Sequence, residues 1–427
     1  MDLKTDQPAR GGMVALVLVA ASVFFNFALS LVNTHLFRTT EAVVVLSEAL
    51  IIGAAAIMIA RFRAVTANPL PWLLIAYFMA LLAVRGEVDL KFARDMAIPL
   101  IFFWLGQFYG IPERLDRFII AVTIVLLVIV TVEMAFVDIY TQFVGVLDYY
   151  IARGTLIDGA SYYSMDLANN AFRPRDEPRQ LLPFLGSHRG SGAFLEPLSA
   201  ANFGAIAAAW MLARQNSRPA VLALLPLPLS LVILADGRFG MGIVILCAFF
   251  LLLRLHRLRL AVALLPVGAA AVTLMMGVLY DFSGLPNTLV GRLWYSGQKL
   301  LSFDLATALG LVVLPVSHDS GLAYMISRMG LPGLTLLWGV FVLLRMPSEE
   351  ARRFHFFVGL YLAALLTISV SSFSLKTAAL LWFCLGTLAA ARRHAPAARA
   401  AGVANARAPG TPVPSKPLTT PSMWRAP

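Results

Sequence analysis

The stretch MVALVLVAASVFFNFALSLVN, residues 13–33, decides the fold class. It is an apolar run without a charged side chain, and about 20 such residues cross a bilayer as a helix. The run is too long for the apolar core of a cleavable signal peptide, so we interpret it as a first membrane-spanning helix. The whole chain shares this character: 59% of its 427 residues are hydrophobic and only 13% are charged. Soluble domains have about 25% charged residues, so we expect an all-α polytopic membrane protein.

Apolar runs of similar length recur along the chain and predict about twelve spans. They lie at 13–33, 41–60, 68–84, 96–110, 118–137, 198–213, 219–235, 240–254, 258–280, 322–344, 355–373 and 376–391. We treat residues 1–391 as a single transmembrane domain. Residues 392–427 are rich in Ala, Pro and Arg without a spaced apolar pattern, which predicts a disordered basic tail.

The distribution of basic residues predicts the orientation. With the N-terminus in the cytoplasm and the spans alternating, nearly every short cytoplasmic loop carries a basic pair or triplet, and these segments hold more than half of the 34 Lys and Arg. This is the positive-inside pattern, and it places the C-terminus in the cytoplasm as well. The net charge of +11 is explained by the same pattern, so we expect no nucleic-acid partner.

Two long polar segments then lie on the opposite, non-cytoplasmic side, at about 138–197 and 281–321. Long loops are uncommon in compact proteins and are usually functional. Because both lie on one face, their polar residues could converge on one site. Cys247 and Cys384 fall in apolar runs, so neither a disulfide framework nor a metal site is expected.

Arginines in these loops are the first candidates for chemistry. A guanidinium matches phosphate oxygens in a bidentate geometry, so Arg189 and Arg292 could bind a lipid diphosphate, with Arg238 and Arg179 in reserve. Trp294, Tyr162 and Tyr163 could stack on sugar rings. The simpler interpretation is that these arginines reach lipid headgroups or pair with loop carboxylates.

Glu196 and His318 are candidates for proton transfer, and each precedes a predicted span. Glu196 could activate or position a sugar hydroxyl, or it could simply cap the helix that follows. His318 could accept or donate a proton, because an unperturbed histidine titrates near neutral pH, or it could be an ordinary residue of the membrane interface.

Asp236 and Arg238 in a tight turn could neutralise each other. Three ionisable residues fall inside or at the end of predicted spans and are expected to face the bundle interior. They are Glu48, Glu133 and Arg328.

An ordered set of motifs between about 180 and 345 resembles the O-antigen polymerase/ligase superfamily. Arg189, Gly192, Phe194 and Pro197 match its Arg-x-x-Gly-x-Phe-x-x-Pro-like run. The later pieces are Asp236-Gly-Arg238-Phe-Gly240, Arg292-Leu-Trp294, and His318 followed by Gly330-Leu-Pro-Gly333. The chain departs from the family at Glu196, where Asn is common, at Gly237, which replaces a serine, and at Asp319. Arg292 and Trp294 are also one residue closer together than the family's pair.

The resemblance implies a glycosyltransferase of the bacterial inner membrane that polymerises undecaprenyl-diphosphate-linked oligosaccharide repeat units into exopolysaccharide or O-antigen. It implies Arg189 and Arg292 as diphosphate ligands and Glu196 or His318 as the group that activates the acceptor. The carrier supplies the leaving group, so no cofactor or metal is required. A polysaccharide co-polymerase or chain-length regulator is a further expected partner.

Two alternatives stay open. A ligase of the same family would transfer a finished glycan to lipid A core or to protein. A transporter or flippase of lipid-linked sugars belongs to another class and should show paired broken helices near the middle of the membrane. The concentration of polar residues in two loops on one side favours an enzyme.

Overall fold

The computed structural model describes residues 7–62, 69–87, 89–156, 171, 179–280, 288–314 and 320–406. Within these ranges the regular elements are all helices, which confirms the all-α prediction. The long helices are α1 (Gln7–His35), α2 (Glu41–Ala60), α4 (Pro69–Arg85), α5 (Leu90–Tyr109), α6 (Pro112–Ala135), α9 (Pro197–Ala213), α12 (Arg238–Leu252), α13 (Arg259–Leu279), α16 (Gly321–Leu343), α17 (Glu349–Leu366) and α18 (Leu375–Ala406). Shorter helices, α10 (Pro219–Leu222) and α11 (Pro226–Leu234), precede α12.

Each of the twelve predicted spans overlaps a helix of the structure. Five helices in the described part of the chain are long and apolar enough to cross a membrane on length and composition. They are Gly11–His35, Glu41–Ala60, Pro112–Ala135, Arg259–Leu279 and Gly321–Leu343. Five further apolar helices are shorter. The protein is therefore membrane-protein-like, while the number of spans and their orientation stay predictions.

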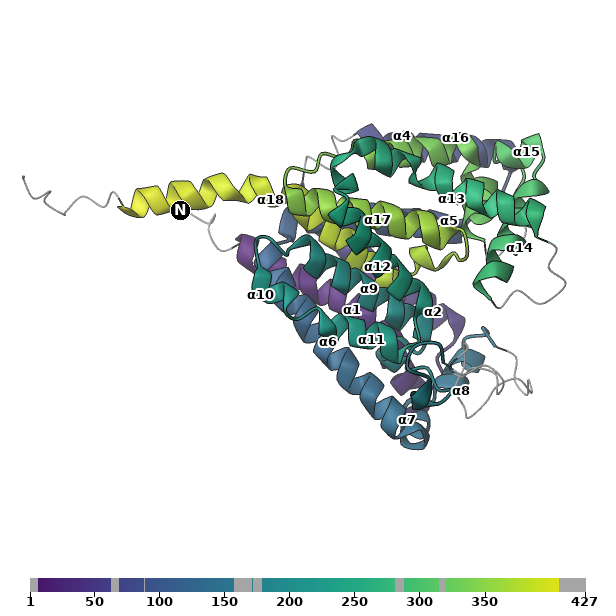
Figure 1. The fold of residues 1–427 in the computed structure, drawn as a ribbon, viewed down its shortest axis with the longest axis horizontal. Coiled ribbons are helices and arrows are strands. Elements are labelled where there is room, and N and C mark those ends of the chain that lie inside the picture. Colours follow the sequence, from purple (N-terminus) through teal and green to yellow (C-terminus); the bar gives the residue numbers. More distant parts are fainter. Residues whose placement is uncertain are drawn as a thin grey trace, which may run out of the picture.

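The core is centred on α5 and α18, which run side by side through the bundle (Figure 1). A Cβ atom at Gly106 of α5 would overlap the backbone of α18 at Phe383, and one at Gly386 of α18 would overlap α5 at Phe103. Small residues let helix backbones approach closely, which is the usual way that membrane helices pack in the absence of a hydrophobic driving force.

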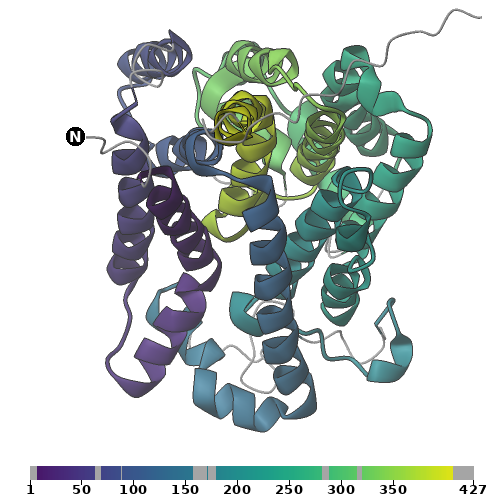
Figure 2. The ribbon, with the colours of Figure 1, turned by 90° about the vertical axis from the view of Figure 1, so that its left-hand side faces the viewer.

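The two ends of the bundle are chemically different. At one end, Arg214 is buried and pairs with Asp116 at 2.9 Å and with Glu350 at 2.6 Å, which ties together α9, α6 and α17. The other end gathers the C-termini of α6 and α11 and the N-termini of α9, α12 and α18. We call it the site end. Figure 2 shows α6 running down to this end, with α7 beneath it.

Both segments that were predicted to be long loops contain helices. The first holds α7 (Val137–Val144), α8 (Val146–Ala152) and the 3-10 turns η1 (Pro183–Leu185) and η2 (Gly192–Phe194). The second holds α14 (Leu289–Leu301) and α15 (Leu305–Ala308). Ile139 and Phe143 of α7 are 64% and 57% exposed, which suits a short helix lying in a membrane interface.

The last helix extends into the C-terminal segment, while the disordered basic tail expected at 392–427 stays a prediction. Helix α18 continues through Ala406, although disorder was expected from residue 392 onward. Alanine has the highest helix propensity of all residues, and the Ala-rich stretch extends the last apolar helix. Residues 407–427 lie outside the described residues.

Candidate functional site

Glu133 organises the site end from the last turns of α6. Its carboxylate is fully buried and accepts hydrogen bonds from His188 Nε2 at 3.0 Å, Ser191 N at 2.8 Å and Ser191 Oγ at 2.9 Å. It also accepts from Gly192 N. A buried carboxylate needs several donors, and here one loop supplies them all. The predicted interior position of Glu133 is confirmed, and its effect is to hold residues 188–192 on the end of α6.

Arg179 fixes the other side of this loop. It is 1% exposed, and its Nη1 and Nη2 atoms each donate at 2.6 Å, to the carbonyls of His188 and Ile233. The guanidinium therefore joins the loop to the end of α11. Because its terminal nitrogens are used in this way and are shielded from solvent, Arg179 is better suited to positioning Arg189 than to the diphosphate binding predicted for it.

Arg189 lies at the junction of the loop and the turn between α11 and α12. Its side chain is 12% exposed. The Nε atom donates a hydrogen bond to Ala235 O at 3.3 Å and lies 4.0 Å from Asp236 Oδ2. Asp236 Oδ1 also accepts from the backbone N–H groups of Gln180 and Leu181 at 3.0 and 2.9 Å. Arg238, the next basic residue, is exposed at the first position of α12.

Glu196 forms the second centre of the site end, at the N-cap of α9. Its Oε2 atom accepts from Lys376 Nζ at 2.9 Å and from Ser199 Oγ at 2.8 Å, and Lys376 also donates to Phe194 O at 3.3 Å. Burial by itself raises the pKa of Glu196, but the charge and hydrogen bond of Lys376 outweigh it and hold that pKa below its ordinary value. Glu196 is therefore ionised at neutral pH.

Two tyrosines of α8, and the arginine that follows this helix, border this pair. The guanidinium carbon of Arg153 lies 5.7 and 5.4 Å from the ring centroids of Tyr149 and Tyr150, a cation–π geometry. Tyr149 donates to Asn26 Oδ1 at 2.5 Å, and both rings are buried, so they support the site rather than offer a stacking surface. We call Glu133, His188, Arg189, Glu196 and Lys376 the polar site.

The remaining predicted residues lie elsewhere. Arg292 and Trp294 are half-buried on α14, which packs against α13 where Gly297 meets Gly277. That helix pair is separate from the elements that carry the polar site. His318, Tyr162 and Tyr163 lie outside the described residues. Within the described ranges, no group of three or more His, Cys, Asp and Glu side chains is placed to hold a metal ion.

Sequence reasoning missed Lys376 and the role of Glu133. A lysine at the second position of the last apolar helix was a visible signal, because a charge at the edge of a span needs a partner. Nothing in the sequence, however, identified Glu196 as that partner, since 180 positions separate the two residues.

Comparison of the chain with protein-family models, with curated proteins and with solved structures finds no match. Function must therefore be inferred from the residues of this chain.

Proposed function

We propose that this protein is a membrane glycosyltransferase that polymerises oligosaccharide repeat units carried on undecaprenyl diphosphate, at the periplasmic face of a bacterial inner membrane. The observation that supports it most directly is the ionised Glu196, held by Lys376 at the same end of the bundle as Arg189. A carboxylate beside basic side chains at a membrane edge suits a sugar hydroxyl that attacks near a diphosphate.

The reaction forms a bond from the acceptor hydroxyl oxygen to the anomeric carbon of the donor sugar. The bond from that carbon to the diphosphate oxygen breaks, and the diphosphate leaves with the electron pair. Arginines placed in advance stabilise that negative charge as it develops, a role assigned to Arg189 with Arg238 as a further ligand.

The hydroxyl proton must pass to a base. A carboxylate whose pKa is lowered is a weak base and a good hydrogen-bond acceptor, so the geometry favours Glu196 as the group that orients the hydroxyl. His318 stays assigned as the proton acceptor, because its ordinary pKa lies near neutrality.

One feature favours the transporter alternative. Helix α16 is broken at Gly330, whose φ of 67° and ψ of 166° are not helical. Broken helices often border substrate sites in transporters, where they come in matched pairs. Gly330 is the one non-helical position inside a helix of the described chain, so it has no matched partner there. We keep the transporter as the second candidate on the strength of this single break.

The two candidates and the ligase are separated by the lipid-linked sugars of a deletion strain. Single repeat units accumulating on the carrier would support the polymerase. Full-length chains retained on the carrier would indicate a ligase, and units stranded on the cytoplasmic leaflet would indicate a flippase. Complementation with the wild-type chain and with Glu113→Gln, which lies at the opposite end of α6 with its side chain 48% exposed, controls for expression.

A further inference from the structure

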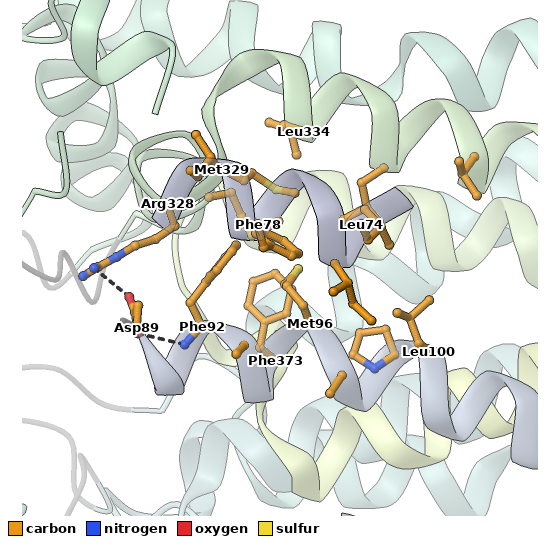
Figure 3. Close-up of a pocket in the computed structure, with 18 of the residues that line it drawn as sticks. Leu74, Phe78, Asp89, Phe92, Met96, Leu100, Arg328, Met329, Leu334 and Phe373 are labelled. Atoms are coloured by element: carbon orange, nitrogen blue, oxygen red, sulfur yellow. Dashed lines mark hydrogen bonds and ion pairs between the residues drawn. The ribbon is translucent and has the colours of Figure 1, made fainter. Parts of the chain in front are cut away.

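A large apolar cavity lies outside the polar site, between α4 and α5. Its volume is about 700 Å³, and α16, α17 and α18 complete its walls. Figure 3 shows Leu74 and Phe78 of α4 facing Phe92 and Met96 of α5 across it, with Phe373 at its side. The cavity therefore separates α4 from the core of the bundle.

The lining determines what can fill this space. Apart from its charged mouth it consists of Leu, Met, Phe, Trp and other apolar side chains. Ordered water needs several polar partners, which these walls do not offer. An empty apolar cavity costs free energy in proportion to its volume. The face of α4 that does not line the cavity is also apolar and exposed, at Leu73 and Val84, so the hydrocarbon chains of the bilayer lie next to it.

The mouth of the cavity carries both signs of charge. Arg328 Nη1 pairs with Asp89 Oδ2 at 2.6 Å, and Arg85 Nη2 donates to Arg328 O at 2.8 Å and to Gly310 O. The Nε atoms of Arg85 and Arg328 are buried without a hydrogen-bond partner among the described residues. Glu87, which is exposed, also lines the mouth. Two guanidinium groups and two carboxylates therefore meet where the cavity opens.

We infer that this cavity binds one acyl chain of a zwitterionic aminophospholipid of the phosphatidylethanolamine type. The chain occupies the apolar space, the phosphate lies against Arg85 and Arg328, and the ammonium group lies against Glu87 and Asp89. A polyprenyl diphosphate carries only negative charge, so the two carboxylates disfavour it. The bound lipid fills the gap beneath α4 and does not take part in the proposed reaction.

The site is tested with the full-length protein purified into nanodiscs that contain phosphatidylethanolamine, phosphatidylglycerol and phosphatidylcholine in equal amounts. Native mass spectrometry after release into detergent counts the lipids that remain bound. We expect phosphatidylethanolamine to be retained at least several-fold over the other two. Equal retention of all three lipids overturns the inference.

Two pairs of variants locate the binding. Ala97→Leu adds bulk to the cavity wall and should abolish the retained lipid, whereas Ala121→Leu, on the exposed apolar face of α6, should not. Glu87→Gln should remove the preference for the ammonium headgroup, whereas Glu41→Gln, exposed at the start of α2, should keep it. Unchanged retention in both Ala97→Leu and Glu87→Gln overturns the site.

Competition with undecaprenyl phosphate identifies the class of lipid. Continued retention of phosphatidylethanolamine at equimolar undecaprenyl phosphate supports the assignment. Its displacement shows that the cavity belongs to the carrier lipid and overturns the aminophospholipid. Because this readout is binding alone, it is independent of whether the protein polymerises sugars.

Discussion

At the scale of single residues, the polar site separates groups that shape it from groups that can meet a substrate. Glu133 and Arg179 are buried with their polar atoms used inside the protein. Arg189 and Glu196 keep 12% and 30% of their side chains exposed. Mutation of Glu133 or Arg179 should therefore lower the stability of the protein, whereas mutation of Arg189 or Glu196 should lower its activity.

Arg189→Ala should abolish high-molecular-weight polysaccharide while membrane insertion stays intact. Removing one charge-stabilising donor from an active site costs on the order of 10² in rate or more, which is enough to stop chain growth. The measurement is polymer length on a gel beside protein level in the membrane fraction. Arg218→Ala, whose side chain is 51% exposed at the opposite end, should behave as wild type. Normal polymer from Arg189→Ala would refute the assignment.

Lys376→Met should shift the pH dependence of polymerisation. In the wild type the pKa of Glu196 is lowered, so the stabilising charge pair is complete above the ordinary pKa of glutamate, about 4.3, and is lost as pH falls through the lower folded value. Without Lys376, only the hydrogen bond of Ser199 and the charge of Arg153 still oppose burial, so the pKa of Glu196 rises. Activity of Lys376→Met should then fall on acidification at a higher pH than activity of the wild type.

The control for this experiment is Ser199→Ala, which removes a neutral hydrogen bond and leaves the charge pair. The pH at which the activity of Ser199→Ala falls on acidification should shift less than it does in Lys376→Met. Superimposable pH profiles for Lys376→Met and the wild type would exclude Glu196 from the reaction.

At the scale of elements, the helices were predictable and the short pieces between them were not. Long apolar runs such as 13–33 leave a helix as the only way to satisfy backbone hydrogen bonds in lipid. Each predicted span overlaps helical structure, although 219–235 falls on the two separate helices α10 and α11. Helices α7, α8 and α14 lie in segments whose polar composition predicted loops. They are short, and tertiary contacts stabilise them, such as the close approach of Gly297 to Gly277.

Glu133→Ala should release the loop that carries Arg189 from the end of α6. The change removes the acceptor of the buried donors of Ser191 and Gly192, at about 1–3 kcal/mol for each group. We expect a lower melting temperature in detergent and a new tryptic cleavage after Arg189. Glu113→Ala, near the other end of the same helix, removes long ion pairs to Arg214 and Arg218 and should not create this cleavage. Resistance to trypsin equal to that of the wild type would show that Glu133 does not hold the loop.

At the scale of the whole molecule, the two ends of the bundle carry different tasks. The end with Arg214, Asp116 and Glu350 is a closed ionic cluster that joins three helices. The site end holds ionisable groups with exposed side-chain atoms. The pattern of basic residues predicts which end faces the cytoplasm, and that orientation stays a prediction. The pairing of Glu196 with Lys376 depends on which helices become neighbours, and hydropathy does not encode that.

Orientation can be measured with single cysteines, because the native Cys247 and Cys384 are buried. Phe184→Cys, at a position 79% exposed at the site end, should react with a membrane-impermeant maleimide in intact cells. Arg218→Cys should react only after the membrane is permeabilised. The reverse pattern would place the polar site in the cytosol and rule out the proposed function.

The distance along the chain between Glu196 and Lys376 has a consequence for biogenesis. The lysine leaves the ribosome 180 residues after its partner, with the last helix of the bundle. Until then the carboxylate has no cation from α18, so a nascent or truncated chain inserts with an incomplete centre. Premature release during translation therefore yields a polypeptide in which Glu196 lacks Lys376, and under the proposed function such a copy would lack the charge pair that lowers the pKa of Glu196.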